Sequence, residues 1–357
     1  MRKLILLILL LSLCSTSVRA TDPIPVQDPE SLIQELPTDS RELLKDIDTT
    51  SPGLINGIVS VFLNALGRST NAIRQGSKTA TILLIIVFLC GLCSSAGYKR
   101  SVCVVVGALG IYGGILGAMG AMIHLSESTI QTLTDYSAIL LPAMASAMAI
   151  SGNPVTAGGI QALTTLFAQL FMRLISKILI PGLYLFLAIA TCECALQSSI
   201  LGEIRKFISW VIEKSLRILL YIFTGFLSLT GVVSGSADAI AIKTAKAAVS
   251  GMVPVVGSIL SDSTETLLSS ALAIKNTIGI IGLLAILGIT VIPFLRIGIQ
   301  YLIMKLTTAV SSTVGVKEHT AMLDHISTAM GLLLAMTGTC SALLLISGVC
   351  FLKVTVI

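Results

Sequence analysis

Charged residues are scarce in this sequence. Asp, Glu, Lys and Arg together make up 11% of its 357 residues, whereas they account for about 25% of a typical soluble domain. So few charges cannot cover the surface of a soluble protein of this length, and the mean hydropathy of +0.96 points the same way. The composition excludes disordered, collagen-like and coiled-coil proteins, argues against a soluble enzyme, and indicates an integral membrane protein.

Aromatic residues are also few, at 5% of the chain. A nucleic-acid-binding surface would combine clusters of Lys and Arg with aromatic side chains, and the sequence contains no such cluster. The net charge of +5 then reflects basic residues in the loops between membrane spans. The expected partner is the lipid bilayer and not a nucleic acid.

Motifs for catalysis and for metal or cofactor binding are missing as well. No Walker A, GxGxxG, GxSxG or kinase pattern occurs in a fitting context, and the glycines from Gly107 to Gly120 lie in one apolar run, where they predict close helix packing. Cys90-Gly-Leu-Cys93 and Cys192-Glu-Cys194 lie in apolar helices, whereas a zinc site needs ligand pairs on loops. We therefore expect no catalytic residue, no metal and no cofactor.

The N-terminal residues differ from the rest of the chain. Residues 1–20 combine Arg2-Lys3, the apolar run Leu4–Leu13 and a small residue at the end, the pattern of a cleavable secretory signal peptide. An uncleaved anchor is the alternative. Residues 21–53 are acidic and rich in proline, which predicts an exported flexible arm with one short helix near Ser40–Ile47.

Residues 54–78 predict an amphipathic helix followed by a linker. Six apolar side chains share one face of this helix by their spacing: Ile55, Ile58, Val59, Phe62, Leu63 and Leu66. Such a helix lies on the outer membrane surface with its apolar face in the lipid. Docking of this face on a partner is the alternative.

The remaining residues, 79–357, predict a polytopic membrane domain. Its runs without Asp, Glu, Lys or Arg are 79–98, 101–126, 136–172, 178–192, 218–237, 276–295 and 326–352. A helix needs about 20 apolar residues to cross a bilayer, so six of these runs predict spans. The third is broken at Ser151–Pro154 and predicts a re-entrant hairpin over 137–172. The predicted fold is all-α, with six or more transmembrane helices and one or two re-entrant or short helical hairpins.

Basic residues indicate the orientation of this domain. Lys99-Arg100 lie between the first two runs, and the amphipathic segment 203–217 carries four further basic residues. Cytoplasmic loops carry an excess of Lys and Arg, so both segments are placed inside. This agrees with an exported N-terminus on a multi-pass protein of the cell membrane.

The segment 236–274 carries charges between two clear spans. An intramembrane charge costs about 2.5–3.5 kcal/mol at the bilayer centre, so these positions are candidates for structural or pore-lining roles. The candidates are Asp238, Lys243, Lys246, Gly251, Pro254, Gly257, Asp262 and Glu265. A helical hairpin that turns near Gly251–Gly257 would pair Lys246 with Asp262 and Lys243 with Glu265. A surface hairpin with solvated charges is the alternative.

Two further features belong with this segment. Glu193 is an acid at the end of the fourth run, and an intramembrane acid is a functional candidate. Residues 149–155 also resemble residues 248–255, since both contain an Ala-x-Ser-Gly stretch followed by Pro-Val. A duplicated half, as in repeat-built transporters, and independent hairpins of similar chemistry both stay open.

The string SGSADAIAIKTAKAAVSGMVPVVGSILSDSTETLL at 234–268 resembles the signature stretch of the stage III sporulation protein AE family. The likeness extends over about residues 50–357 in its general layout. It implies a subunit of the channel or secretion-like complex in the mother-cell membrane that faces the forespore. Other sporulation-complex membrane proteins would be its partners, in an oligomer or hetero-complex. The family has no established catalytic residues.

Other functions fit the same composition. A stand-alone secondary transporter built on broken-helix hairpins is the main alternative, and it would bind and move a small solute by itself. A structural scaffold without a pathway is another. A channel subunit differs from the transporter because it acts only together with several membrane partners.

Overall fold

The computed structural model describes residues 29–44, 54–150, 154–252, 257–314 and 316–353. Every regular element in these ranges is a helix, which confirms the predicted all-α fold. In chain order the helices are α2 (Pro29–Gln34), α3 (Thr38–Leu44), α4 (Leu54–Arg68), α5 (Thr70–Ser95), α6 (Arg100–Ile150), α7 (Pro154–Leu174), the π-helical turn η1 (Ile175–Leu179), α8 (Ile180–Leu196), α9 (Ser199–Met252), α10 (Gly257–Val314) and α11 (Lys317–Lys353).

Several helices are much longer than the charge-free runs predict. α6, α9 and α10 contain 51, 54 and 58 residues. At 1.5 Å per residue these helices are about 75–90 Å long, whereas the hydrocarbon core of a bilayer is about 30 Å thick. Each of them therefore extends well beyond a single membrane crossing.

α6 joins the second charge-free run and the first arm of the third. The polar stretch 127–135 between them does not end the helix, because its side chains form hydrogen bonds within it. Thr129 donates to the carbonyl of Leu125 at 2.7 Å, and the amide of Gln131 donates to Asp135 at 2.9 Å. The hairpin predicted over 137–172 is thus formed by the ends of two long helices, and its depth in a bilayer stays a prediction.

α7, η1 and α8 form one continuous helical stretch across Arg173 and Lys177. The π-helical turn directly precedes Pro181. Proline has no N–H to donate to the carbonyl four residues before it, so a widened turn accommodates the ring without ending the helix. The second arm of the third run and the fourth run are therefore a single rod.

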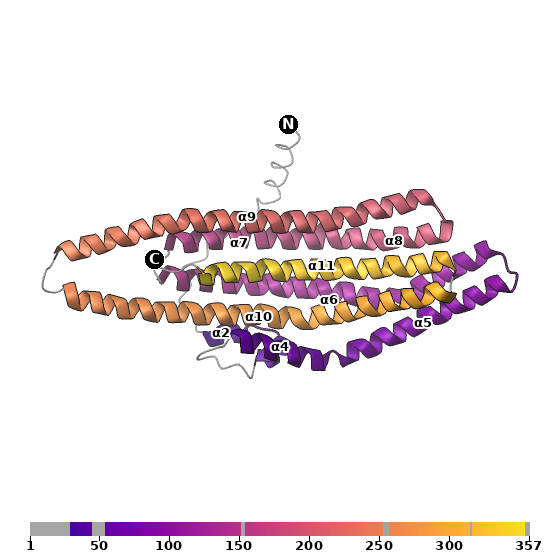
Figure 1. Cartoon of the computed structure of the whole chain (residues 1–357), viewed down its shortest axis with the longest axis horizontal. Coiled ribbons are helices and arrows are strands. Elements are labelled where there is room, and N and C mark those ends of the chain that lie inside the picture. The colour runs from indigo at the N-terminus through magenta and orange to yellow at the C-terminus, as the bar shows by residue number, and fades with distance from the viewer. Residues whose placement is uncertain (1–28, 45–53, 151–153, 253–256, 315, 354–357) are drawn as a thin grey trace, which may run out of the picture.

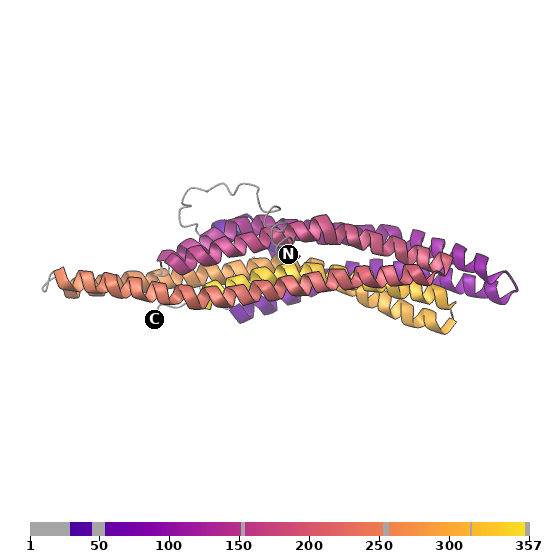
Figure 2. The same ribbon diagram turned by 90° about the horizontal axis from the view of Figure 1, so that it is seen from above.

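The long helices form two layers (Figures 1 and 2). α9, α11 and α10 lie next to one another in one layer, and α7–α8, α6 and α5 form the other. α11 contacts α6 and α8 across the layers, and α9 contacts α7 and α8. Four phenylalanines fill the bundle as fully buried side chains: Phe171, Phe186, Phe223 and Phe351.

The helix ends gather at the two ends of the long axis. The ends of α5, α8 and α10 lie with the beginnings of α6, α9 and α11 at one end of the bundle (Figure 1). The ends of α6 and α9 and the beginnings of α7 and α10 lie toward the other. α6 and α9 thus end toward the same end of the bundle, each within one of the two related segments 149–155 and 248–255.

Five of the described helical stretches are long and apolar enough to cross a membrane. They are Thr70–Ser95, Arg100–Ile150, Ala157–Leu196, Asn276–Thr313 and Lys317–Val349. The run 218–237 lies in α9, but side chains from residue 227 to 252 are outside the described part of the chain. The membrane character of the fold is confirmed, and a sixth span in α9 stays a prediction.

Part of the N-terminal arm packs against the bundle. α2 and α3 contact α10, and three of their leucines are buried: Leu32, Leu36 and Leu43. Arg41 donates to the backbone carbonyls of Gln34 and Leu36, so it caps carbonyl groups at and just after the C-terminal end of α2. The short helix predicted near Ser40–Ile47 overlaps α3, but the prediction of a flexible arm is wrong for α2 and α3, because leucine spacing gave these short helices one apolar face. The predicted signal peptide, 1–20, lies outside the described residues.

α4 lies along α10 with its small residues inward. Gly57, Val61 and Ala65 are buried, and a Cβ added at Gly57 would come within 2.8 Å of Leu284 Cδ1. Five of the six apolar side chains predicted to share a face are exposed, from Ile58 at 40% to Leu63 at 61%, and the side chain of Ile55 is outside the described part of the chain. This face is free to contact lipid or a partner, as expected. The predicted linker is helical too, since α5 begins at Thr70.

Candidate functional site

The best-defined polar site lies where α8 turns back into α9. α8 ends before Gln197, whose φ of 51° is in the left-handed region, and α9 then returns beside α8. Glu193 of α8 faces Gly202 of α9, where an added Cβ would lie 2.7 Å from Oε1 of the carboxylate. Glycine at this position therefore lets the carboxylate lie directly against the backbone of α9.

Glu193 forms an ion pair with Arg205 of α9. Nε of Arg205 donates to Oε2 of Glu193 at 2.6 Å, and the two side chains are only 12% and 22% exposed. The guanidinium also lies over the ring of Phe186, 5.9 Å from its centroid, which adds a cation–π contact. Low exposure strengthens the attraction between the charges and makes loss of either partner costly.

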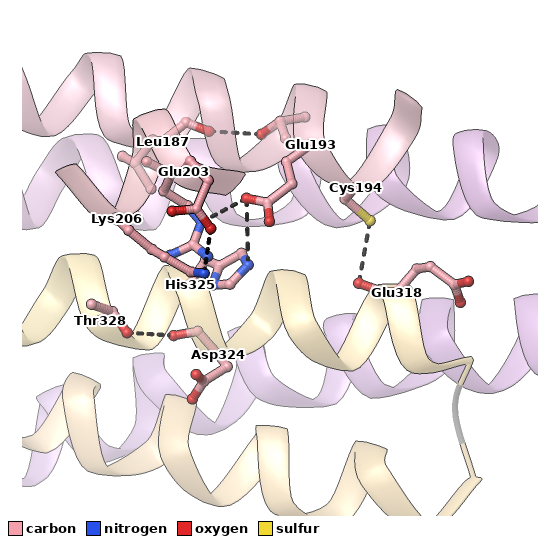
Figure 3. Close-up of polar contacts among 11 residues, drawn as sticks. Leu187, Glu193, Cys194, Glu203, Lys206, Glu318, Asp324, His325 and Thr328 are labelled. Atoms are coloured by element: carbon pink, nitrogen blue, oxygen red, sulfur yellow. Dashed lines mark hydrogen bonds and ion pairs between the residues drawn. The ribbon is translucent and has the colours of Figure 1, made fainter. Parts of the chain in front are cut away.

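α11 completes this site. Nε2 of His325 lies 3.8 Å from the same Oε2 of Glu193, and Figure 3 shows the imidazole pointing toward the carboxylate. The thiol of Cys194 donates to the backbone carbonyl of Glu318 at 3.3 Å. Three helices therefore meet at one carboxylate.

Further ion pairs extend this network to α6 and α10. Arg100, the first residue of α6, donates to both carboxylate oxygens of Glu318 at 3.0 and 3.2 Å. Lys305 of α10 donates to Asp324 at 2.7 Å. We call this set of residues the end cluster: Arg100, Glu193, Arg205, Lys305, Glu318, Asp324 and His325. It ties together the ends of α6, α8, α9, α10 and α11.

The chemistry available in the end cluster is that of charge pairing. Among the described residues, no group of three His, Cys, Asp or Glu side chains is placed to hold a metal ion. Nearby on the exposed side of α9, Lys206 donates to Glu203 at 2.7 Å, and this hydrogen bond lowers the pKa of the Glu203 carboxyl. The arrangement holds helices in register and keeps one partly buried carboxylate next to an imidazole.

The candidates from 236–274 lie toward the opposite end of the bundle. Four are on the last part of α9, three are on the first part of α10, and Pro254 is in the undescribed segment 253–256. In this order they are Asp238, Lys243, Lys246 and Gly251, then Gly257, Asp262 and Glu265. The helices end at Met252 and begin at Gly257, so the helix break lies where it was predicted. The side chains are outside the described part, and the two Lys–acid pairs stay predictions.

Sequence reasoning found one member of the end cluster and missed the others. Glu193 stood out as an acid in an apolar run. Arg205 follows it by twelve residues across a short turn, a separation that could have suggested the pair. Glu318 and His325 come from more than a hundred residues away, and no local pattern indicates that they meet Glu193 and Arg100.

Comparison with known proteins gives a consistent family match. The family model described as Stage III sporulation protein AE matches residues 40–355. The chain is similar to the Stage III sporulation protein AE of Bacillus subtilis (strain 168), with 26% identity over 242 residues. That alignment covers 68% of this chain and 59% of the relative, so the chain spans less than two thirds of the relative's length. No solved structure matches it.

Proposed function

The chain belongs to the stage III sporulation protein AE family, and from this premise we propose that it is a subunit of a channel or secretion-like complex. The complex would lie in the mother-cell membrane and connect it with the forespore. The observation that carries the proposal is the family match over residues 40–355. This match covers nearly the whole membrane domain, including the segment 234–268.

The exposed apolar surface supports a role within a membrane assembly. Large apolar side chains are about half exposed along one side of α5: Ile82, Ile85, Phe88, Leu89 and Leu92. The apolar face of α4 is exposed in the same way. Surfaces of this kind need lipid or other membrane proteins to cover them.

The distribution of basic residues supports an orientation. Lys99-Arg100, Arg205-Lys206 and Lys317 all belong to the end where α5, α8 and α10 finish. The positive-inside rule places this end in the mother-cell cytoplasm. The opposite end, with the charges from Asp238 to Glu265, would then lie toward the forespore, together with the exported N-terminus.

We propose that Lys243, Lys246, Asp262 and Glu265 form ion pairs between α9 and α10 that the channel complex requires. Charge swapping tests this in a sporulating host that lacks its own family member. Replacing both lysines by Glu should abolish forespore gene expression, and adding Asp262→Lys and Glu265→Lys should restore at least part of it. Lys317→Glu, an exposed change at the other end, is the matched control.

The same strains test assembly. A channel subunit should co-purify with several other sporulation membrane proteins, and the lysine variant should lose them while the four-residue swap regains them. Failure of the swap to restore either readout, with normal protein levels, would refute the paired hairpin. Normal forespore expression without any co-purifying membrane protein would refute the channel-complex assignment.

The alternative of a stand-alone secondary transporter is favoured by the related segments 149–155 and 248–255. α6 and α9 end within these segments toward the same end of the bundle, so any repeat would be parallel and not inverted (Figure 1). Parallel repeats occur in transporters as well. The purified chain in liposomes distinguishes the two functions, because a transporter would accumulate a solute without any partner.

A further inference from the structure

A groove of about 470 Å³ lies between α9, α10 and α11. It does not include Glu193 or Arg205, shares Lys305 with the end cluster, and uses residues that the proposed function does not. Its charged lining residues are Glu213, Arg217 and Lys305, with Tyr301 beside them. Its apolar lining residues are Leu216, Leu220, Leu332 and Ala335. Charged and apolar side chains thus share one elongated space.

The two basic residues come from helices on either side of α11 (Figure 1). Arg217 is on α9 and Lys305 is on α10, and both line the same groove. Lys305 holds Asp324 at 2.7 Å, but its side chain is 42% exposed and an ammonium has further N–H donors. Two cations that flank an opening between membrane helices match the negative charge of a phosphodiester.

The groove lies at the edge of the apolar zone. Arg217 is the last charged residue before the run 218–237, and Leu220 follows it one turn farther in. On α11, the charge-free run begins at residue 326, and Ala335 lies more than two turns inside it. The charged residues therefore lie at headgroup depth, while Leu220 and Ala335 extend into the region of acyl chains.

We propose that this groove binds one phospholipid. Its phosphate lies between Arg217 and Lys305, and one acyl chain follows Leu216, Leu220 and Ala335 into the bundle. Free phosphate is also an anion but would leave the apolar half of the groove uncovered. A phospholipid pairs its phosphate with the basic residues and covers the apolar half with an acyl chain. Its headgroup would connect α9 with α10.

The test uses the full chain in detergent after lipid has been stripped from it. Native mass spectrometry with added phosphatidylglycerol should show one retained lipid per chain. Arg217→Gln together with Lys305→Gln should weaken retention at least tenfold. Ala335→Trp, which fills the apolar half, should abolish retention while both basic residues remain. Thermal unfolding without lipid identifies any variant that fails to fold.

Matched changes outside the groove serve as controls. Lys317→Gln removes an exposed positive charge at the same end, and Leu306→Trp enlarges a side chain that is 66% exposed on α10. Neither should change retention. An equal loss in either control would overturn the proposal, because binding would then be non-specific.

The headgroup and the tail are tested separately. Diacylglycerol, which has the tails without the phosphate, should bind at least tenfold more weakly than phosphatidylglycerol. Inorganic phosphate at 100-fold excess over the lipid should not displace it. Equal binding of diacylglycerol would overturn the proposal, because the basic residues would then contribute nothing to binding. Displacement by inorganic phosphate would also overturn it, because the acyl chain would then contribute nothing.

Discussion

The end cluster and the middle of the bundle hold their helices together with different polar groups. At the end, carboxylates meet guanidinium, ammonium and imidazole groups, as in Glu193–Arg205 and Lys305–Asp324. In the middle, hydroxyls meet hydroxyls. Ser126 of α6 lies 2.7 Å from Thr337 of α11, and Ser347 of α11 donates to Thr164 of α7 at 2.9 Å. All four of these hydroxyl-bearing residues are fully buried.

This difference follows from the cost of burying each group. Charged side chains lose several kcal/mol of hydration in an apolar environment, so they are placed near helix ends, where water and headgroups are close. Hydroxyls lose less and satisfy each other, or bond a carbonyl one turn back. The contrast predicts large effects for changes at the end cluster and small ones for the hydroxyl pairs.

The largest effect is expected beside the end cluster, at Gly107 of α6. An added Cβ would lie 2.2 Å from Nε2 of His319 and 3.0 Å from Sγ of Cys90. His319 is fully buried and its Nε2 contacts the carbonyl of Val104 at 3.2 Å, so the ring has little room to move. Gly107→Ala should therefore destabilise the chain by about 3 kcal/mol, measured by reversible unfolding in detergent.

Gly113→Ala on the same helix is the matched control. Nothing lies within 4 Å of its added Cβ, and alanine favours a helix over glycine, so stability should stay equal or rise by about 0.5–1 kcal/mol. Similar losses at both positions would contradict the packing argument. Recovery of stability when Gly107→Ala is combined with His319→Ala would support it.

The second effect concerns Glu193. Glu193→Gln leaves Arg205, which is 12% exposed, without a carboxylate, and should cost about 2 kcal/mol. Glu203→Gln also removes one carboxylate from an ion pair on neighbouring α9. Its side chain is 74% exposed, so the loss of stability should be much smaller than for Glu193→Gln. The same unfolding assay compares the two variants.

Combining Glu193→Gln with Arg205→Met shows whether the stability lost in Glu193→Gln comes from the broken ion pair or from altered side-chain packing. If the cost comes from an unpaired buried cation, the double variant should be more stable than the single one. A double variant that is less stable by the sum of two independent losses would mean that Glu193 and Arg205 act separately.

Sequence reasoning predicted the helices and their breaks better than their lengths and neighbours. Charge-free runs indicated where helices lie, and the Gly/Pro stretches marked where α6 and α9 end. Polar stretches such as 127–135 separate the charge-free runs, and sequence patterns do not reveal that their side chains form hydrogen bonds within one continuous helix. The packing of residues 29–44 against α10 was not predicted, because their acidic composition indicated an exposed arm. The spacing of Leu32, Leu36 and Leu43 would have indicated an apolar helix face.

The glycines between Gly107 and Gly120 show the same limit. Close packing was predicted for the run, and a Cβ added at Gly110 or Gly114 would lie 3.2 Å from Ile86 Cγ2 or 3.4 Å from Leu83 Cδ2. A Cβ added at Gly117 would meet nothing within 4 Å. Composition indicates that a helix is able to pack closely, but only the three-dimensional arrangement decides which of its faces does so.

The smallest effect is expected at the hydroxyl pair Ser126–Thr337. Thr337 donates its only hydroxyl proton to the carbonyl of Leu333 at 3.1 Å, so Ser126 must be the donor to Thr337. Ser126→Ala therefore leaves Thr337 with a partner and should cost about 0.6 kcal/mol. Thr337→Val removes the acceptor of Ser126 and should cost about 1 kcal/mol. In the double variant both hydroxyls are gone, so its loss of stability should be smaller than the sum of the two single losses.

A loss of stability in Ser126→Ala as large as that in Glu193→Gln would contradict the contrast between the two regions, because a neutral pair would then hold the helices as strongly as an ionic one.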